Sequence, residues 1–278
     1  MKEKKKVLIV TQEMEPYAAL SEIAAIARKL PQFAQEKRGM EVRVLMPRYG
    51  TINERRHRLH EVVRLSGMNI IVDDEDYPLI IKVASLPGAR MQVYFLDNED
   101  FFKRKSVFED AKGVPFKDNP DRMIFFCKGI IETVKKFGWP PDIVHCHGWM
   151  TSMLPLYLRE AYKNEPLFEN SKIVYSMYNN DMETTMDVNA FKGKAAINSL
   201  EEKHLEAYLQ GEGVTLHEGA MKYSDAIIRG SAEYNEGMED LIAGTDLPVL
   251  PHQSPEEYLV AYLDFYHSLL EQEESVEG

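Results

Sequence analysis

Short runs of aliphatic residues, separated by segments with helical spacing, constrain the fold of this chain more than any other feature. The first run, Val7–Val10, is continuous and rich in β-branched residues, which suits a strand buried on both faces of a parallel sheet. Apolar residues then recur at helical spacing from Leu20 to Leu30, and a second apolar run follows at Val42–Met46. A strand, a helix and a strand in this order predict a βαβ unit. We expect Pro31 to interrupt or kink the helix, because proline has no N–H to donate.

The segment from His57 to Leu96 has a different rhythm and predicts a β-hairpin insertion. Short stretches rich in Val, Ile and Tyr alternate there with polar residues, at 68–72, 77–84 and 91–96. Leu86-Pro87-Gly88-Ala89 is a turn signal between two of them. Further along, the pattern predicts helices over 122–137, 150–162 and 233–242 and strands over 142–147, 172–177 and 226–228. The chain therefore predicts an α/β fold with a doubly wound, mostly parallel sheet.

The carboxy-terminal segment carries an apolar stripe at helical spacing. Its members are Leu259, Tyr262, Leu263, Tyr266 and Leu270. We therefore expect one domain over residues 1–250 and a docking helix within 251–278 that packs back on that domain. The last residues, Glu271–Gly278, form an acidic tail that we expect to be frayed.

Composition narrows the class of protein. The 278 residues carry a formal net charge of −12, which disfavours nucleic acid as a partner because phosphate neutralisation needs a basic face. Two cysteines, Cys127 and Cys146, are too few for a disulfide scaffold. No apolar run approaches the roughly 20 residues that span a bilayer. We expect a cytoplasmic globular protein without a membrane partner.

The cluster His145-Cys146-His147-Gly148-Trp149 follows a predicted buried strand and is the strongest local candidate for a site. Ligands of open parallel sheets bind at the carboxyl ends of strands. On a strand, His145 and His147 face one side, which raises the question of a metal, but zinc needs three or four ligands and no spaced Cys/His pair occurs elsewhere. Two other interpretations are open. Either a histidine is a core residue with its hydrogen bonds made, beside a Trp149 that packs in the core, or the cluster lines a cleft.

Two further sites are disfavoured by the residues themselves. Cys146 faces away from its histidine neighbours on a strand, so neither imidazole can act as its base. The loop Thr11–Leu20 follows the first strand as a phosphate loop would, but no glycine precedes Gly39 to let the backbone approach a phosphate.

Several motifs occur in a familiar order. Pro141–Trp149 reads Pro-Asp-Ile-Val-His-Cys-His-Gly-Trp, and Leu154–Leu158 continues it. The others are Val7–Val10, Glu13–Ala18, Lys29–Pro31, Arg38–Gly50, Tyr94–Asn98, Asp118–Asn119 with Arg122 and Phe125, Val174–Asn179 and Tyr223–Ala226. In order and spacing they resemble the amino-terminal domain of bacterial glycogen synthases and plant starch synthases, two-domain glucosyltransferases of the GT-B type. The resemblance runs from about Val7 to about Ile242 and implies the Rossmann-like half of a GT-B fold.

The departures from this family fall on its chemistry. The family's first loop carries Lys-x-Gly-Gly, whose lysine and glycine amides meet the sugar nucleotide, whereas Ala18-Ala19 here continues into Leu20-Ser21-Glu22. Gly148 stands where the family has an aspartate implicated in catalysis, and Tyr178 where it has a histidine that contacts the transferred glucose. The family also carries the stretch Asn-Leu-Ala-Tyr-Gln-Gly after the position of Tyr178, and this chain lacks it. We expect no second, nucleotide-binding domain after Ile242.

These departures imply a domain that has lost transferase activity and serves glucan binding or regulation, with no catalytic residue, cofactor or metal assigned. One alternative is half of a split glucosyltransferase that moves glucose from a nucleotide-sugar to an α-1,4-glucan with a partner chain. Another is a homo-oligomeric scaffold that uses the cleft face. The candidate cleft-lining residues are His145, His147, Gly148, Trp149, Tyr178, Asn179, Asp118 and Asn119.

Overall fold

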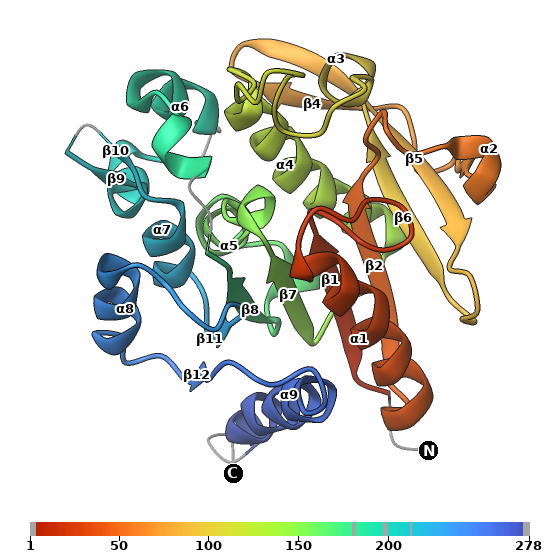
Figure 1. Ribbon diagram of the computed structural model, residues 1–278, viewed down its shortest axis with the longest axis vertical. Helices are drawn as coiled ribbons and strands as arrows, with labels where there is room; N and C mark the ends of the chain where they lie inside the picture. The colour runs from red at the N-terminus through yellow and green to blue at the C-terminus, as the bar shows by residue number, and fades with distance from the viewer. Residues whose placement is uncertain (1–3, 180–181, 197–199, 212, 275–278) are drawn as a thin grey trace.

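One large sheet organises the fold of the computed structural model, which describes residues 4–179, 182–196, 200–211 and 213–274. Its strands are β1 (Lys6–Thr11), β2 (Glu41–Pro47), β3 (His60–Glu61), β4 (Met68–Val72), β5 (Glu75–Ser85), β6 (Gln92–Asp97), β7 (Ile143–His147), β8 (Lys172–Met177), β11 (Ala226–Arg229) and β12 (Val249–Leu250). They lie in the order β12-β11-β8-β7-β1-β2-β6-β5-β3, and β4 pairs with β5 beside that path (Figure 1). Every pairing from β12 to β6 is parallel, whereas β5 runs antiparallel to its three neighbours.

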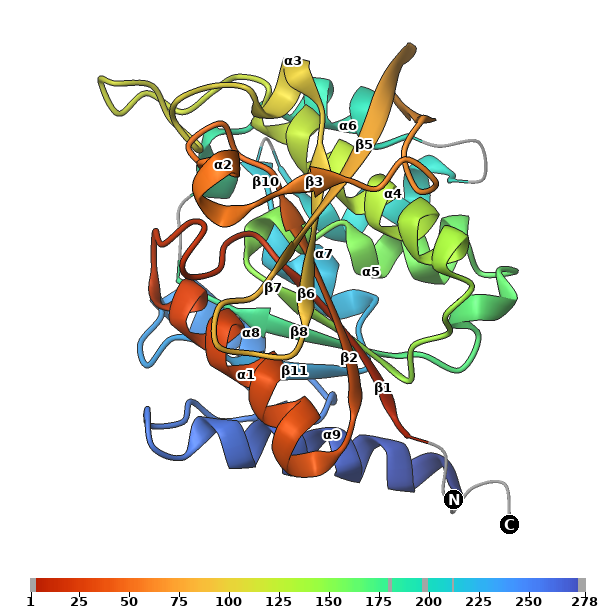
Figure 2. The same ribbon diagram turned by 90° about the vertical axis from the view of Figure 1, so that its right-hand side faces the viewer.

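Helices cover both faces of the sheet. The α-helices of seven or more residues are α1 (Glu22–Arg38), α4 (Asn119–Phe137), α6 (Val188–Ala195), α7 (Leu216–Lys222), α8 (Glu236–Ala243) and α9 (Tyr258–Glu274). The shorter elements are α2 (Glu54–His57), α3 (Glu99–Phe102), α5 (Leu154–Leu156), η1 (Trp149–Thr151), η2 (Tyr157–Ala161), η3 (Pro166–Phe168), η4 (Met182–Thr185), η5 (Glu202–Tyr208), β9 (Leu209–Gln210) and β10 (Gly213–Val214). Helices α1 and α9 lie on one face, and α4, α5 and α7 lie on the other (Figure 2). None of the described helices is long and apolar enough to cross a bilayer.

The expected doubly wound α/β architecture is confirmed. The predicted strands correspond to β1, β2, β7, β8 and β11, and the fully buried aliphatic residues that they carry form the centre of the core. The predicted hairpin is also confirmed, because β5 and β6 pair antiparallel on either side of the turn at 86–91. Since β6 also pairs in parallel with β2, the hairpin extends the main sheet.

Of the two expectations for Pro31, that it interrupts the first helix or that it kinks it, the interruption is wrong. The helix continues through Pro31 to Arg38 and ends at Gly39, whose left-handed backbone caps it. One face of α1 is buried on both sides of the proline, with Ala27, Leu30 and Ala34 fully covered. Tertiary packing therefore outweighs the one backbone hydrogen bond that proline cannot make.

Two other predicted segments differ from the structure. The segment 150–162 is helical but divides into η1, α5 and the wider π turn η2. Pro155 lies in the first turn of α5, where its missing N–H is tolerated and separates α5 from η1. Within 179–213, where the sequence predicts no element, the structure shows η4, α6, η5 and β9. Helix α9 extends to Glu274, so the first four residues of the expected frayed tail are helical, and residues 275–278 lie outside the described part of the chain.

Helix α9 docks as its apolar stripe predicts. Leu263 and Tyr266 are fully buried, and Tyr262 is nearly so. Helix α9 packs against α1 (Figure 2), where Arg38 forms an ion pair of 2.8 Å with Asp264. Because this ion pair is partly exposed, burial of the apolar stripe supplies most of the docking energy.

We predict that Leu263→Ala lowers the free energy of unfolding by about 2–5 kcal/mol, because it leaves a cavity under a docked helix. Urea denaturation followed by circular dichroism measures this loss. Val260→Ala on the same helix is the control, because Val260 is 45% exposed, and it should change stability by less than about 0.5 kcal/mol. Equal effects of the two substitutions would show that α9 is not held by its apolar face.

Candidate functional site: a pocket where the sheet reverses direction

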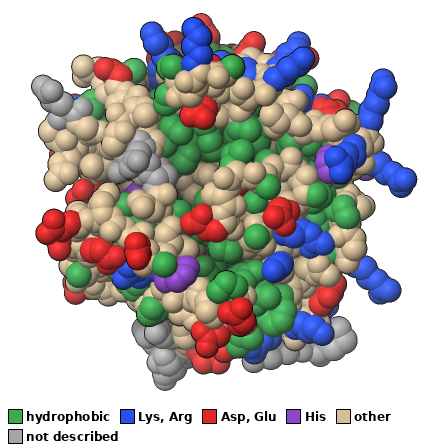
Figure 3. All heavy atoms as spheres, in the orientation of Figure 1, with side chains coloured by type: hydrophobic (Ala, Val, Ile, Leu, Met, Phe, Trp, Pro, Cys, Tyr) green, Lys and Arg blue, Asp and Glu red, His purple; other side chains and the backbone are tan. Residues whose placement is uncertain are grey.

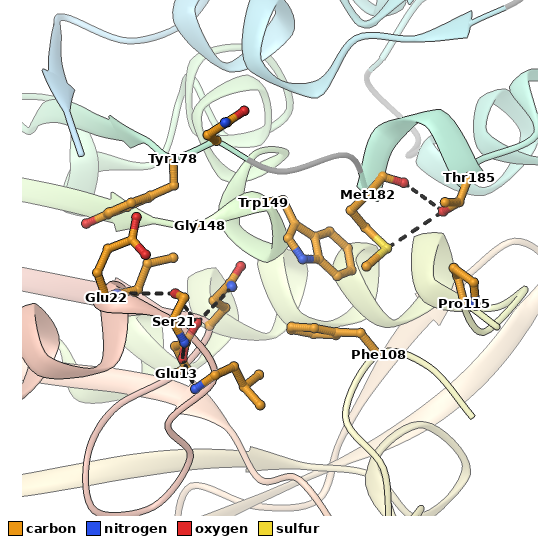
Figure 4. Close-up of a pocket in the computed structure, with 14 residues that line it drawn as sticks. Glu13, Ser21, Glu22, Phe108, Pro115, Gly148, Trp149, Tyr178, Met182 and Thr185 are labelled. Carbon is orange, nitrogen blue, oxygen red and sulfur yellow. Dashed lines mark hydrogen bonds between the residues drawn. The ribbon is translucent and has the colours of Figure 1, made fainter. Parts of the chain in front are cut away.

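The pocket lies at the point where the chain reverses its direction across the sheet. From β1 the chain proceeds to β2 and β6 on one side, and it later returns to β7 and β8 on the other side. The loops after β1 and β7 therefore part at their carboxyl ends and leave a crevice, which is where open α/β sheets bind ligands. A pocket of about 340 Å³ occupies this crevice (Figure 4). Its walls come from the loop after β1, the start of α1, the turn after β7, the end of β8 and two further loops.

The side chain of Glu13 forms the floor beside α1. It is fully buried, and its Oε2 accepts hydrogen bonds from the backbone N–H groups of Leu20 (2.5 Å) and Ser21 (2.8 Å). Its Oε1 accepts from the Ser21 hydroxyl (2.8 Å) and from Gln12 Nε2 (3.2 Å). Ser21 in turn caps helix α1 by accepting from the N–H of Ile23. The chain's own carboxylate thus occupies the amide donors that precede the helix.

Gln12 and Gly148 form a matched pair across the crevice. Gly148 has φ +86° and ψ 165°, a conformation that only glycine adopts easily. A Cβ atom at position 148 would lie 2.2 Å from Gln12 Oε1, so the glutamine side chain fills the space that a side chain at 148 would need. Because Gln12 Nε2 donates to Glu13, Oε1 faces away from the carboxylate and has no hydrogen-bond partner among the described residues.

The opposite wall of the pocket is apolar. The rings of Trp149 and Phe108 meet edge to face with centroids 4.9 Å apart. Met182 and Pro115 continue this wall (Figure 4), and Leu20, which is 50% exposed, lies at the rim. Figure 3 shows apolar side chains gathered in a hollow above the centre of this face. Such a surface is suited to the C–H face of a ring.

Tyr178 closes the pocket at the end of β8. Its ring packs so tightly under Gly230 that a Cβ there would come within 2.4 Å of it. Burial raises the pKa of Tyr178 well above its usual value, so the phenol keeps its proton. That hydroxyl lies 2.9 Å from His147 Nδ1.

The two histidines of β7 lie behind Tyr178 and share a buried polar network. His147 Nε2 is 3.1 Å from His145 Nδ1, and the ring centroids are 3.8 Å apart. His145 also contacts the hydroxyl of Tyr266 on α9 (2.5 Å from Nδ1) and that of Ser176 on β8 (2.7 Å from Nε2). Burial lowers the pKa of His145 well below its usual value and that of His147 to about 3, so both rings are neutral.

The structure brings together only some of the residues singled out by sequence. Gly148, Trp149, Tyr178 and Asn179 line the pocket. His145 and His147 are fully buried beneath it and do not line it, because their strand is covered on both faces.

Asp118 and Asn119, at the start of α4, do not line the crevice pocket. Asp118 forms a bidentate ion pair with Arg104 beside a separate shallow pocket. Asn119 is buried and braces Arg122 with its amide oxygen. The amide nitrogen of Asn119 donates to the carbonyl of Phe108 (2.9 Å) and to the sulfur of Met182 (3.5 Å), so Asn119 supports the apolar wall from behind.

Several pocket residues are absent from the sequence-based candidates. They are Gln12, Glu13, Leu20, Ser21, Glu22, Ile23, Phe108, Pro115, Met182 and Thr185. The position of Gln12 and Glu13 directly after a buried strand is a signal that could have identified them. Phe108 comes from a loop and Met182 from the short helix η4, and neither segment has a periodicity that would signal a site. Within the described residues no group of three His, Cys, Asp or Glu side chains is placed to hold a metal.

The chain is similar to glycogen and starch synthases over most of its length. A family model described as the starch synthase catalytic domain matches residues 6–247. The glycogen synthase of Chlorobium limicola is 42% identical over 175 residues, which cover 63% of this chain and 36% of that protein. The glycogen synthase of Chlorobaculum tepidum is 35% identical over 237 residues, which cover 84% of this chain and 47% of that protein.

A solved structure supports the same relation at the level of the fold. The catalytic domain of starch synthase IV from Arabidopsis thaliana, bound to ADP and acarbose, superposes with a TM-score of 0.67 at 19% identity. The match covers 83% of this chain and 45% of that one. The chain thus spans less than half the length of the relatives described here.

The buried histidines should make the protein less stable in acid. In the unfolded chain each titrates near 6.5, whereas burial lowers the folded-state pKa of His147 to about 3 and that of His217 to about 4. Below pH 6.5 the unfolded chain therefore binds more protons, and we predict a loss of about 1.4 kcal/mol per pH unit for each such histidine. Urea denaturation between pH 7 and pH 5 measures the slope. His147→Gln should remove one histidine's share, and a slope unchanged by this substitution would contradict the assignment.

The fit between Gln12 and Gly148 predicts an energetic coupling. Gly148→Ala should cost at least about 3 kcal/mol, because it combines backbone strain with a clash. Gln12→Ala in the same chain should recover about 1–3 kcal/mol of that cost. Gly39→Ala is the matched control: Gly39 also has a positive φ (+65°), but its Cβ would meet nothing within 4 Å. One double-mutant cycle combines Gln12→Ala with Gly148→Ala, and the control cycle combines Gln12→Ala with Gly39→Ala. Equal coupling energies in the two cycles would contradict the fit between Gln12 and Gly148.

Proposed function

The chain belongs to the starch synthase catalytic domain family, and from this premise we propose that it binds an α-glucan in the crevice without transferring glucose. Its fold is the Rossmann-like half of a GT-B fold, and the chain is a glycogen/starch synthase-like glycosyltransferase domain. The observation that carries the proposal is the Glu13 carboxylate, which occupies the amide donors before helix α1.

The electrostatics of the pocket disfavour a nucleotide-sugar diphosphate. A diphosphate needs cations or unoccupied N–H donors. Among the described residues that line the pocket none is Lys, Arg or His, whereas Glu13 and Glu22 bring two carboxylates. Ala18-Ala19 and Ser21-Glu22 stand in the loop where the family carries its lysine and glycines, so the substitutions and the electrostatics agree.

The position of the family's catalytic aspartate is closed by packing. Gly148 stands there, and Gln12 fills the space into which a side chain would extend. The position of the histidine that contacts the transferred glucose holds Tyr178, whose hydroxyl faces His147. Loss of a single preorganised electrostatic contact lowers a transfer rate by about 10²–10³, and these losses combine.

The remaining surface suits a neutral sugar ring. Trp149, Phe108 and Met182 offer an apolar wall for the C–H face of a hexose. The Glu22 carboxylate is an acceptor on the other side, and hydroxyl groups are the donors that match it. A pocket of about 340 Å³ lies at the small end of the range for ligand sites and would hold one end of a chain of sugars.

A second candidate function is one half of a split glucosyltransferase. The observation that favours it is the apolar rim, where Leu20 is half exposed, and the exposed Val114 precedes the lining residue Pro115 in sequence. A partner chain seated there would supply the cationic groups that the pocket lacks. A second copy of this chain on the same rim would instead make the protein a homo-oligomeric scaffold.

We predict that the purified chain transfers no glucose from ADP-glucose or UDP-glucose to glycogen above a boiled control. A radiolabel incorporation assay measures this transfer. Transfer well above the control would contradict the loss of activity, and transfer that appears only when a copurifying chain is added would establish the split enzyme. Light scattering on the same sample distinguishes a monomer from a homo-oligomer.

Glucan binding, the other part of the proposal, is tested by a separate titration. Trp149→Phe should weaken maltotriose binding about two- to tenfold in isothermal titration, because it removes part of the apolar wall. Trp139→Phe is the matched control, since Trp139 is equally buried but contacts Glu41 and Arg43 far from the pocket. Absence of maltotriose binding by the unmodified chain would overturn glucan binding at this site.

A further inference from the structure

Polar side chains at the start of α4 hold the loop that joins α3 to α4. Asp118 forms its bidentate ion pair with Arg104, near the beginning of this loop. Arg122 is fully buried, and its Nε donates to the carbonyl of Phe101 (2.9 Å) while its Nη1 donates to the carbonyl of Val107 (2.6 Å). The loop is therefore fastened to the first turn of α4 at several points along its length.

Asn119 connects this loop to a second segment of the chain. Its side chain is 1% exposed, and its Nδ2 donates both to the carbonyl of Phe108 and to the sulfur of Met182. Phe108 and Met182 come from segments that are distant in sequence, and both belong to the apolar wall of the pocket (Figure 4). A single buried amide group thus joins the two parts of the wall.

Arg122 fixes the direction in which the Asn119 amide points. Its Nη1 donates to Asn119 Oδ1 at 2.8 Å. If the amide were turned over, its NH₂ group would face the guanidinium donor and its oxygen would face the carbonyl of Phe108. Both contacts would then be unfavourable in a buried site. In the observed direction the NH₂ group has two acceptors and the oxygen has a donor.

We propose that Asn119 is a positioning residue that holds Phe108 and Met182 in place as the apolar wall of the ligand site. The ring of Phe108 in turn covers Trp149, with which it packs edge to face. Loss of the Asn119 amide therefore releases the Phe108 backbone and uncovers Trp149. The effect of Asn119 on ligand affinity rests on the proposed glucan binding, whereas its effect on the position of the wall does not.

Asn119→Asp tests this role because it replaces only the NH₂ group of the side chain. The carboxylate keeps an acceptor for Arg122 but turns an oxygen toward the carbonyl of Phe108, and two acceptors repel each other. The test uses the full chain with Trp139→Phe as the parent, in which Trp149 is the only tryptophan. Trp149 is 3% exposed, so acrylamide should quench its fluorescence weakly in the parent and more strongly in Asn119→Asp.

Asn98→Asp is the matched control. Asn98 is also 1% exposed, and its Nδ2 donates to the carbonyl of Pro78 (3.0 Å), which does not belong to the pocket wall. Its Oδ1 caps α3, a role that aspartate retains. This substitution should therefore leave the quenching of Trp149 unchanged. If Asn119→Asp does not fold, Asn119→Ala, which buries no charge, takes its place.

Different results decide the two proposals separately. Equal quenching of Trp149 in the Asn119 and Asn98 variants would overturn the positioning role, because a residue that only stabilises the fold would not expose Trp149 in the folded state. If maltotriose binds the parent, Asn119→Asp should weaken it about two- to tenfold and Asn98→Asp should not, as expected for loss of a buried hydrogen bond. Equal affinity in these two variants would overturn the effect of Asn119 on the ligand site. If maltotriose binds none of the proteins, the proposed glucan binding fails, while the quenching still decides what holds the wall.

Discussion

The parallel pairing of β1 with β7 is the constraint on which the site depends. Val10 lies opposite Cys146 and Thr11 opposite His147, and the backbone N–H of Gln12 then donates to the carbonyl of His147. This register places Gln12 and Glu13 against Gly148 and Trp149 as the two strands end. A shift by one residue would turn both histidines of β7 to the other face of the sheet and separate Gln12 from Gly148.

Glu13 determines what this crevice can accept. A helix N-terminus at the end of a first strand ordinarily attracts anions. Here the carboxylate of Glu13 takes the N–H groups of Leu20 and Ser21, and no cation among the described lining residues offsets it. The crevice thus has the position of an anion site, but its two carboxylates disfavour an anion.

The sequence predicted the frame of the fold because its strands are continuous apolar runs, and such runs have few alternatives. Alternation along a strand also placed His145 and His147 on one side of β7. The partners of these histidines were beyond prediction, because Tyr266 is 121 residues from His145 and no local pattern links them. Helix α1 continued through Pro31 for a similar reason, since burial against the sheet is a property of the assembled fold. Phe108 reaches the pocket from a loop and Met182 from the short helix η4, where spacing carries no information.

A competition between neutral and anionic ligands tests the central claim most directly. Isothermal titration of the full chain with maltotriose and with ADP-glucose, each at low and at physiological salt, compares them at one pocket. We predict that maltotriose binds with an affinity that salt does not change, and that ADP-glucose binds no more tightly than maltotriose. Tighter binding of ADP-glucose, weakening as salt is added, would contradict the claim, because it would require a phosphate site that Glu13 leaves no room for.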